Sequence, residues 1–214
     1  MNSSAINDRL VEVGQRHGFD LRHALQVSRL ATRLFDDLQP LHAMGNTERI
    51  WLRAAAMLHD VGKARAPSVH HKVARDVIIR SANLPFRREE RLIIGLTARY
   101  HRGSLPETRH RYFRRLDAYS RLCVRKLAAL LRIADGLDKG HADLVDDLQC
   151  EVRPRSVLIR VAGRDRPTLT KALKKADLFE EVFGRQIVIC AEVLPRLQEF
   201  ELDSNRPSVY AEAG

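Results

Sequence analysis

The segment AAAMLHDVGKA, residues Ala54–Ala64, constrains the fold of this 214-residue chain more than any other stretch. Its apolar part is typical of a buried helix, which ends in the adjacent polar residues His59 and Asp60. Burying an imidazole and a carboxylate costs free energy unless both find partners. We therefore expect a helical core in which other polar side chains meet these two residues.

Helical spacing of apolar residues dominates the first two thirds of the chain. Asp20 and Thr47 are placed to cap two of the helices, and Gly136 to stop the last of them. Helices are expected at residues 21–38, 48–58, around 73–78, 89–99 and 121–135.

The pattern changes in the last third of the chain. Short β-type runs at Cys150–Arg153 and Val157–Val161 precede a helix expected from Thr168 to Phe183, and Gln186–Cys190 reads as a third strand. We expect a mainly α fold with a small C-terminal ββαβ appendage. The predicted division is a helical domain over residues 1–145, a ββαβ subdomain over 146–200 and a tail over 201–214.

Composition narrows the setting. Three cysteines, no CxxC motif, no signal-peptide pattern and no apolar run long enough to span a membrane indicate a cytoplasmic protein without a membrane partner. The net charge is +10, and Phe86–Lys126 carries twelve Lys and Arg against four Asp and Glu. Such a stretch attracts phosphates and other polyanions, or is simply a solvated basic face. Nucleic-acid binding rests on charge alone and is the least favoured interpretation.

Four polar residues fall on apolar helix faces or helix ends: His23, His59, Asp60 and Asp135. A divalent cation would offset the cost of burying two carboxylates and two imidazoles together. This mixed nitrogen and oxygen set suits Mn, Fe, Zn or Mg better than a thiolate-type structural zinc site.

Each of these residues also has a simpler explanation. A histidine on an apolar face is usually satisfied by a backbone carbonyl, and Asp60 could cap the following segment. Asp135 could pair with Arg132 or Arg125. Spacing alone leaves both interpretations open.

The order His23, His59-Asp60, Asp135 resembles the H…HD…D pattern of the HD superfamily of metal-dependent phosphohydrolases. Further motifs resemble the C-terminal HD region of the exopolyphosphatase/guanosine pentaphosphate phosphatase (Ppx/GppA) family. They are LRAAAMLHDVGK, HHK, LTARYHRGSLP, RIADGLDKGH and KKADLFEEVFGR, and they span about Asp20 to Val193.

The resemblance implies an HD-domain helical bundle with one or two divalent ions. It assigns His23, His59, Asp60 and Asp135 to the first ion. A second ion would use His71, or its neighbour His70, together with His101, although HHK is followed here by Val73-Ala74 where the family often has His-Ser. Family members usually carry an N-terminal actin-like domain that holds their phosphate-cleaving site. This sequence begins close to the HD module itself, so we expect the module to work alone.

The expected function is metal-dependent hydrolysis of a phosphate ester or anhydride, of nucleotide, alarmone or polyphosphate type. Asp60 would be a ligand and proton acceptor, and Lys63, Arg102 and Lys139 would contact phosphate. The alternative is a non-catalytic module that binds polyphosphate or a partner, with the metal as a structural staple. The resemblance also implies a homodimer.

Overall fold

The computed structural model describes residues 3–138, 140–141, 143–163 and 169–192. It is mainly helical with a small sheet near the C-terminus, as predicted. None of the helices described is long and apolar enough to cross a membrane. The elements in chain order are α1 (Ser3–Arg16), α2 (Leu21–Asp37), α3 (Gln39–His42), α4 (Asn46–Leu58), α5 (His70–Arg80), α6 (Arg88–Arg99), the 3-10 helix η1 (Phe113–Arg115), α7 (Ala118–Leu137), β1 (Val145–Val152), β2 (Ser156–Gly163), α8 (Thr170–Leu173), α9 (Asp177–Phe183) and β3 (Gln186–Glu192).

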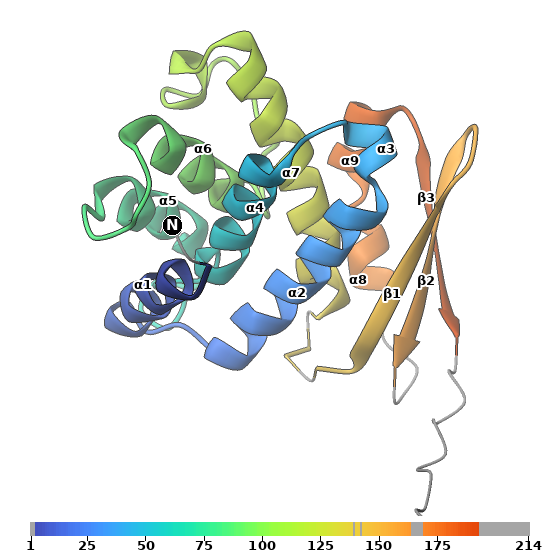
Figure 1. Cartoon of the computed structure of the whole chain (residues 1–214), viewed down its shortest axis with the longest axis horizontal. Coiled ribbons are helices and arrows are strands. Elements are labelled where there is room, and N and C mark those ends of the chain that lie inside the picture. Colours follow the sequence, from blue (N-terminus) through green and yellow to red (C-terminus); the bar gives the residue numbers. More distant parts are fainter. Residues whose placement is uncertain (1–2, 139, 142, 164–168, 193–214) are drawn as a thin grey trace, which may run out of the picture.

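Helices α2, α4, α6 and α7 pack against one another and form the bundle (Figure 1). Helix α4 is buried on almost every side from Ala54 to Leu58, and α7 is buried without interruption from Leu127 to Leu137. A helix that is apolar all round must lie inside the protein. The ends of α4 and α7 therefore carry their polar residues into the core.

The predicted cap at Asp20 is confirmed, because its side chain accepts a hydrogen bond from the backbone N–H of His23 at 3.1 Å. The predicted cap at Thr47 is wrong. Helix α4 begins at Asn46 and is capped by Gly45, whose N–H donates to the Glu48 carboxylate at 2.9 Å. The longer Glu48 side chain satisfies the helix start, so the Thr47 hydroxyl is not needed.

Gly136 does not stop α7, which continues to Leu137. A Cβ atom at this position would lie 2.5 Å from Cα of Ala172. The glycine therefore allows the backbone of α8 to approach α7 closely, and its role is packing between helices.

The ββαβ order is confirmed: β1 pairs antiparallel with β2, and β2 parallel with β3. Strand β1 begins at Val145, five residues before the predicted start, because Val145 and Leu148 pack into the core beside α2. Figure 1 shows the sheet on one side of the bundle, beside α2 and α9 and opposite α5 and α6.

The predicted helix Thr168–Phe183 is instead two short helices, α8 and α9, and Thr168 itself lies outside the described residues. The buried Arg132 side chain donates from Nε to the carbonyl of Lys175, between the two helices, at 3.3 Å. It also pairs with Asp177 at the start of α9, 2.7 Å away. The expected tail, residues 201–214, likewise lies outside the described part of the chain.

Candidate metal centre

Six polar side chains from five parts of the bundle converge at one buried place. His23 lies in the first turn of α2, His59 and Asp60 follow α4, and His70 begins α5. His101 follows α6 by two residues, and Asp135 lies in the last turn of α7. None of the six is more than 7% exposed: His23, His59, Asp60, His70, His101 and Asp135.

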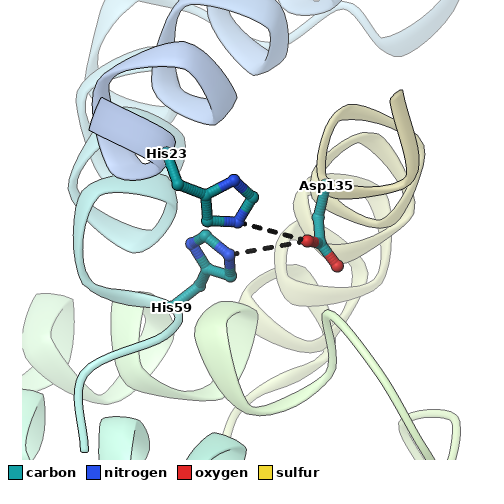
Figure 2. Close-up of side chains that lie close together, drawn as sticks. All are labelled: His23, His59 and Asp135. Atoms are coloured by element: carbon teal, nitrogen blue, oxygen red, sulfur yellow. Dashed lines mark ion pairs between the residues drawn. The ribbon is translucent and has the colours of Figure 1, made fainter. Parts of the chain in front are cut away.

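The first part of this cluster joins the four residues predicted to hold an ion. Nε2 of His23 lies 3.5 Å from Oδ1 of Asp135, and Nε2 of His59 lies 3.7 Å from the same oxygen (Figure 2). Asp60 approaches from the other side, with Oδ2 3.6 Å from Nε2 of His23 and Oδ1 3.7 Å from Nε2 of His59. These separations are too long for strong hydrogen bonds and leave room for an ion between the atoms.

The second part of the cluster lies on the far side of Asp60. Nε2 of His70 is 3.0 Å from Oδ1 of Asp60, and Nε2 of His101 is 3.6 Å from the same oxygen. The two imidazole Nε2 atoms are 3.4 Å apart. His71 is buried separately, and its Nδ1 has no hydrogen-bond partner in the described part of the chain. The structure thus brings His70 and His101 to Asp60, and does not bring His71 there.

Backbone carbonyls fix the tautomers of three of these histidines. Nδ1 lies 2.7 Å from the carbonyl oxygen three residues earlier in His59, His70 and His101, the partners being Ala56, Pro67 and Ala98. A carbonyl oxygen only accepts, so each Nδ1 carries a proton and Nε2 is the nitrogen whose lone pair an ion can use. The simpler explanation of a core histidine satisfied by a carbonyl therefore accounts for only one of the two ring nitrogens.

The fourth imidazole is oriented by a side chain. Nδ1 of His23 is 2.7 Å from Oδ2 of Asp138, a residue that the sequence analysis did not single out. The Nε2 atoms of His23 and His59 are both completely buried and make no hydrogen bond with any described residue. Buried polar atoms without partners are rare in proteins and need an explanation, such as a bound ion. Because the donors are imidazole nitrogens and carboxylate oxygens, the residues fit a divalent ion such as Mn, Fe or Zn.

The site holds strongly perturbed charges. Burial alone would raise the pKa of Asp135, but His23, His59 and Lys175 hold it well below its usual value. The pKa of Asp60 is likewise lowered against burial by His59, His70 and its other neighbours. Burial lowers the pKa of His23, yet the nearby Asp135 and Asp138 carboxylates outweigh that effect and raise it to about 9. Both carboxylates therefore stay ionised and attract a cation.

Two lysines also reach the carboxylates. Nζ of Lys63 is 2.5 Å from Oδ2 of Asp60 and 3.0 Å from Nε2 of His141. Lys175, from the segment between α8 and α9, forms an ion pair with Oδ2 of Asp135.

The arginines suggested as partners of Asp135 pair elsewhere. Arg132 contacts Asp177, and Arg125 contacts Glu181. That simpler explanation of Asp135 is therefore wrong, and Lys175 is its charged partner.

The residues predicted to contact phosphate lie at different distances from the site. Lys63 lies in the site, whereas Arg102 lies beside it, with Nη1 3.4 Å from the carbonyl of Pro67. Lys139 falls outside the described residues. His141, which sequence reasoning missed, stacks on His23 with ring centroids 3.7 Å apart, and its Nδ1 is 2.9 Å from Oδ2 of Asp20.

Comparison with known families assigns the chain to one of them. Residues 7–182 match the model of Ppx/GppA phosphatase, domain III. The chain belongs to this family. The match confirms the resemblance to the C-terminal region of Ppx/GppA proteins and includes all six residues of the buried polar cluster described above. No curated protein matches the chain. The family relationship gives a phosphatase context to this domain III chain.

Proposed function

We propose that this domain is a metal-dependent phosphohydrolase of the HD type that acts on a phosphate ester or anhydride. The observation that carries the proposal is the pair of buried Nε2 atoms, on His23 and His59, that face the Asp135 carboxylate without a hydrogen bond. The membership of a phosphatase family supports the substrate class. Nucleotides, alarmones and polyphosphate are the substrate types that we propose.

His23, His59, Asp60 and Asp135 would hold the first ion, and Asp60 with His70 and His101 would hold a second. A bound divalent ion supplies a water molecule of lowered pKa and polarises a phosphoryl oxygen. Backbone carbonyls hold Nδ1 of three of these imidazoles, so that Nε2 is the ring nitrogen directed at the proposed ions.

The chain's own groups would complete the chemistry. Asp60 is ionised and would orient the attacking water, while its lowered pKa makes it a weak proton acceptor. Lys63 lies 33% exposed at the edge of the site and can donate to a non-bridging phosphate oxygen. Arg102, beside the carbonyl of Pro67, can add a second donor for a longer phosphate chain. His141 packs on His23 and helps to hold that ring in place.

The second candidate is a non-catalytic module that binds polyphosphate or a partner. It is favoured by a groove of about 870 Å³ near α7, to which the basic stretch Phe86–Lys126 contributes Arg109, Arg121 and Arg125. Two of these arginines are paired with acidic neighbours, Arg109 with Glu107 and Arg125 with Glu181. The site chemistry therefore makes hydrolysis the first proposal.

The test combines metal content with phosphate release. Protein purified without chelator would be compared with Asp135→Asn and with Asp147→Asn, an exposed carboxylate on β1 that serves as control. We expect wild type and Asp147→Asn to hold manganese or another divalent ion and to release phosphate from inorganic polyphosphate or a nucleoside triphosphate. Asp135→Asn should lose both properties while keeping its helical circular dichroism.

Two results would count against hydrolysis. Equal metal content and turnover in Asp135→Asn and wild type would remove the proposed site. Polyphosphate binding that survives metal removal, falls steeply with salt and leads to no phosphate release would establish the binding module instead.

A further inference from the structure

The ammonium group of Lys175 contacts the same carboxylate that a divalent ion would use. The two oxygens of the Asp135 carboxylate have different neighbours in the structure. Oδ1 faces Nε2 of His23 and of His59, while Oδ2 forms an ion pair with Lys175. An ion bound at Asp135 would therefore share one buried carboxylate with a lysine.

Two cations on one carboxylate oppose each other. Asp135 is 2% exposed and the Lys175 side chain is 17% exposed, so water screens their interaction only weakly. The ammonium also lies 3.4 Å from the carbonyl oxygen of His101, so it reaches the second half of the cluster as well. The positive charge of Lys175 consequently disfavours an ion at Asp135.

The main chain holds this lysine beside the site. Arg132 donates to the carbonyl of Lys175 at 3.3 Å and pairs with Asp177 two residues later. Gly136 permits the close contact between α7 and α8 immediately before this segment. A group that is tethered in this way competes at a high, fixed effective concentration that dilution cannot lower.

We propose that Lys175 is a built-in competitor of the divalent ion at Asp135, so that the site loads metal only when the free ion is abundant. In the metal-free protein the same ammonium neutralises the buried Asp135 charge and stabilises the fold. The inference rests on the proposed metal site, and it assigns a regulatory part to a residue of the C-terminal ββαβ segment.

The experiment measures manganese affinity by isothermal titration calorimetry in chelator-treated protein. Lys175→Met removes the ammonium and keeps the length of the side chain. Lys174→Met removes the same charge from the neighbouring exposed lysine and is the matched control. Lys175→Gln is a second variant that retains a hydrogen-bond donor, in case the methionine variant folds poorly. Asp135→Asn identifies the heat that belongs to this site.

We expect the dissociation constant of manganese to fall about tenfold in Lys175→Met and Lys175→Gln and to stay unchanged in Lys174→Met. A second readout is the melting temperature. The metal-free Lys175 variants should melt below wild type, and manganese should raise their melting temperature by more than it raises that of wild type.

Unchanged or weaker affinity in both Lys175 variants, with wild type binding manganese in an Asp135-dependent manner, would overturn the inference and leave the metal site standing. An equal gain in manganese affinity in Lys174→Met would also overturn it, because the gain would then come from the lower net charge of the protein and not from the contact with Asp135. If neither wild type nor the Lys175 variants bind manganese, the metal site and the inference both fail. Binding that appears only in the Lys175 variants would support the inference.

Discussion

Nε2 of His70 lies 3.0 Å from Oδ1 of Asp60, whereas the adjacent His71 is buried apart from that carboxylate. The pair HHK therefore contains one residue of the site and one residue of the surrounding core. Helix geometry explains the difference, because consecutive helical residues point in directions about 100° apart.

This difference predicts unequal effects of two neighbouring substitutions. His70→Ala should lower the metal content by about one equivalent, because the proposed second ion would lose one of its three protein ligands, Asp60, His70 and His101. His71→Ala should leave the metal content unchanged. Elemental analysis of both purified variants is the measurement, and loss of metal from His71→Ala alone would contradict the assignment of His70.

Asp138 orients His23 through the 2.7 Å contact between Oδ2 and Nδ1. Its Oδ1 also accepts from the N–H of Asp143 at 3.0 Å, so the carboxylate itself is held in place. Removal of such an orienting group typically weakens metal binding by about 10–100-fold, and we expect that loss in Asp138→Asn. Calorimetry with manganese checks it, with Asp147→Asn as the control. Full affinity in Asp138→Asn would show that His23 needs no orienting carboxylate.

Gly136→Ala should destabilise the protein by about 1–3 kcal/mol, the usual cost of overpacking a buried contact. The added Cβ would lie 2.5 Å from Cα of Ala172, which is backbone and cannot rotate away. Gly45→Ala adds the same methyl group without a clash, since its nearest neighbour would be Oε2 of Glu48 at 3.7 Å, and reports only the smaller cost of replacing a helix-capping glycine. Chemical denaturation of both variants measures the difference. Equal stability of Gly136→Ala and wild type would mean that α8 moves away from α7 without cost.

His42 predicts a pH dependence that is separate from the site. It is 1% exposed, its Nε2 lies 2.7 Å from the carbonyl of Phe35, and its Nδ1 accepts from the N–H of Met44 at 2.9 Å. Burial lowers the pKa of this imidazole. Below about pH 6.5 the unfolded chain therefore binds a proton there that the folded chain does not. The contribution of His42 to the free energy of unfolding is complete above pH 6.5 and is lost as the pH falls toward the folded-state pKa.

The measurement compares wild type with His42→Gln. The difference between their free energies of unfolding should narrow as the pH falls from 7 to 5, with a slope that approaches about 1.4 kcal/mol per pH unit. The site histidines are the same in both proteins, so their titration cancels. A constant difference over this range would show that His42 takes up its proton in the folded state.

Most helices and strands, and the central residues of the candidate site, can be predicted from local sequence. His59 and Asp60 were visible because they end an apolar helix, and Asp135 because it shares a face with Leu131 and Val124. The ββαβ order followed from short β-type runs around one helical segment. What local sequence could not supply was the choice between two adjacent histidines, since that depends on how α5 is rotated against α4 and α6.

Other parts of the site needed tertiary information. Lys175 is forty residues from Asp135 along the chain, and nothing near it in sequence marks it as a partner. His141 reaches Asp20 across an even longer separation. Asp138 alone carried a local signal, because it follows Asp135 by three residues, a spacing that places both near one side of a helix end. Gly136 was misread because a glycine near a helix end fits a stop and a close helix contact equally well.

The group that accepts the Nδ1 hydrogen bond of each imidazole determines which substitutions near the site this domain can tolerate. In His59, His70 and His101 the acceptor is a main-chain oxygen one helical turn earlier, which any residue type provides. Ala56, Pro67 and Ala98 can therefore be exchanged without removing the acceptor, as long as the local backbone path is kept. His23 alone depends on the identity of a second side chain. Among the four imidazoles, His23 is the one whose orientation can be lost through a single substitution of another side chain, Asp138.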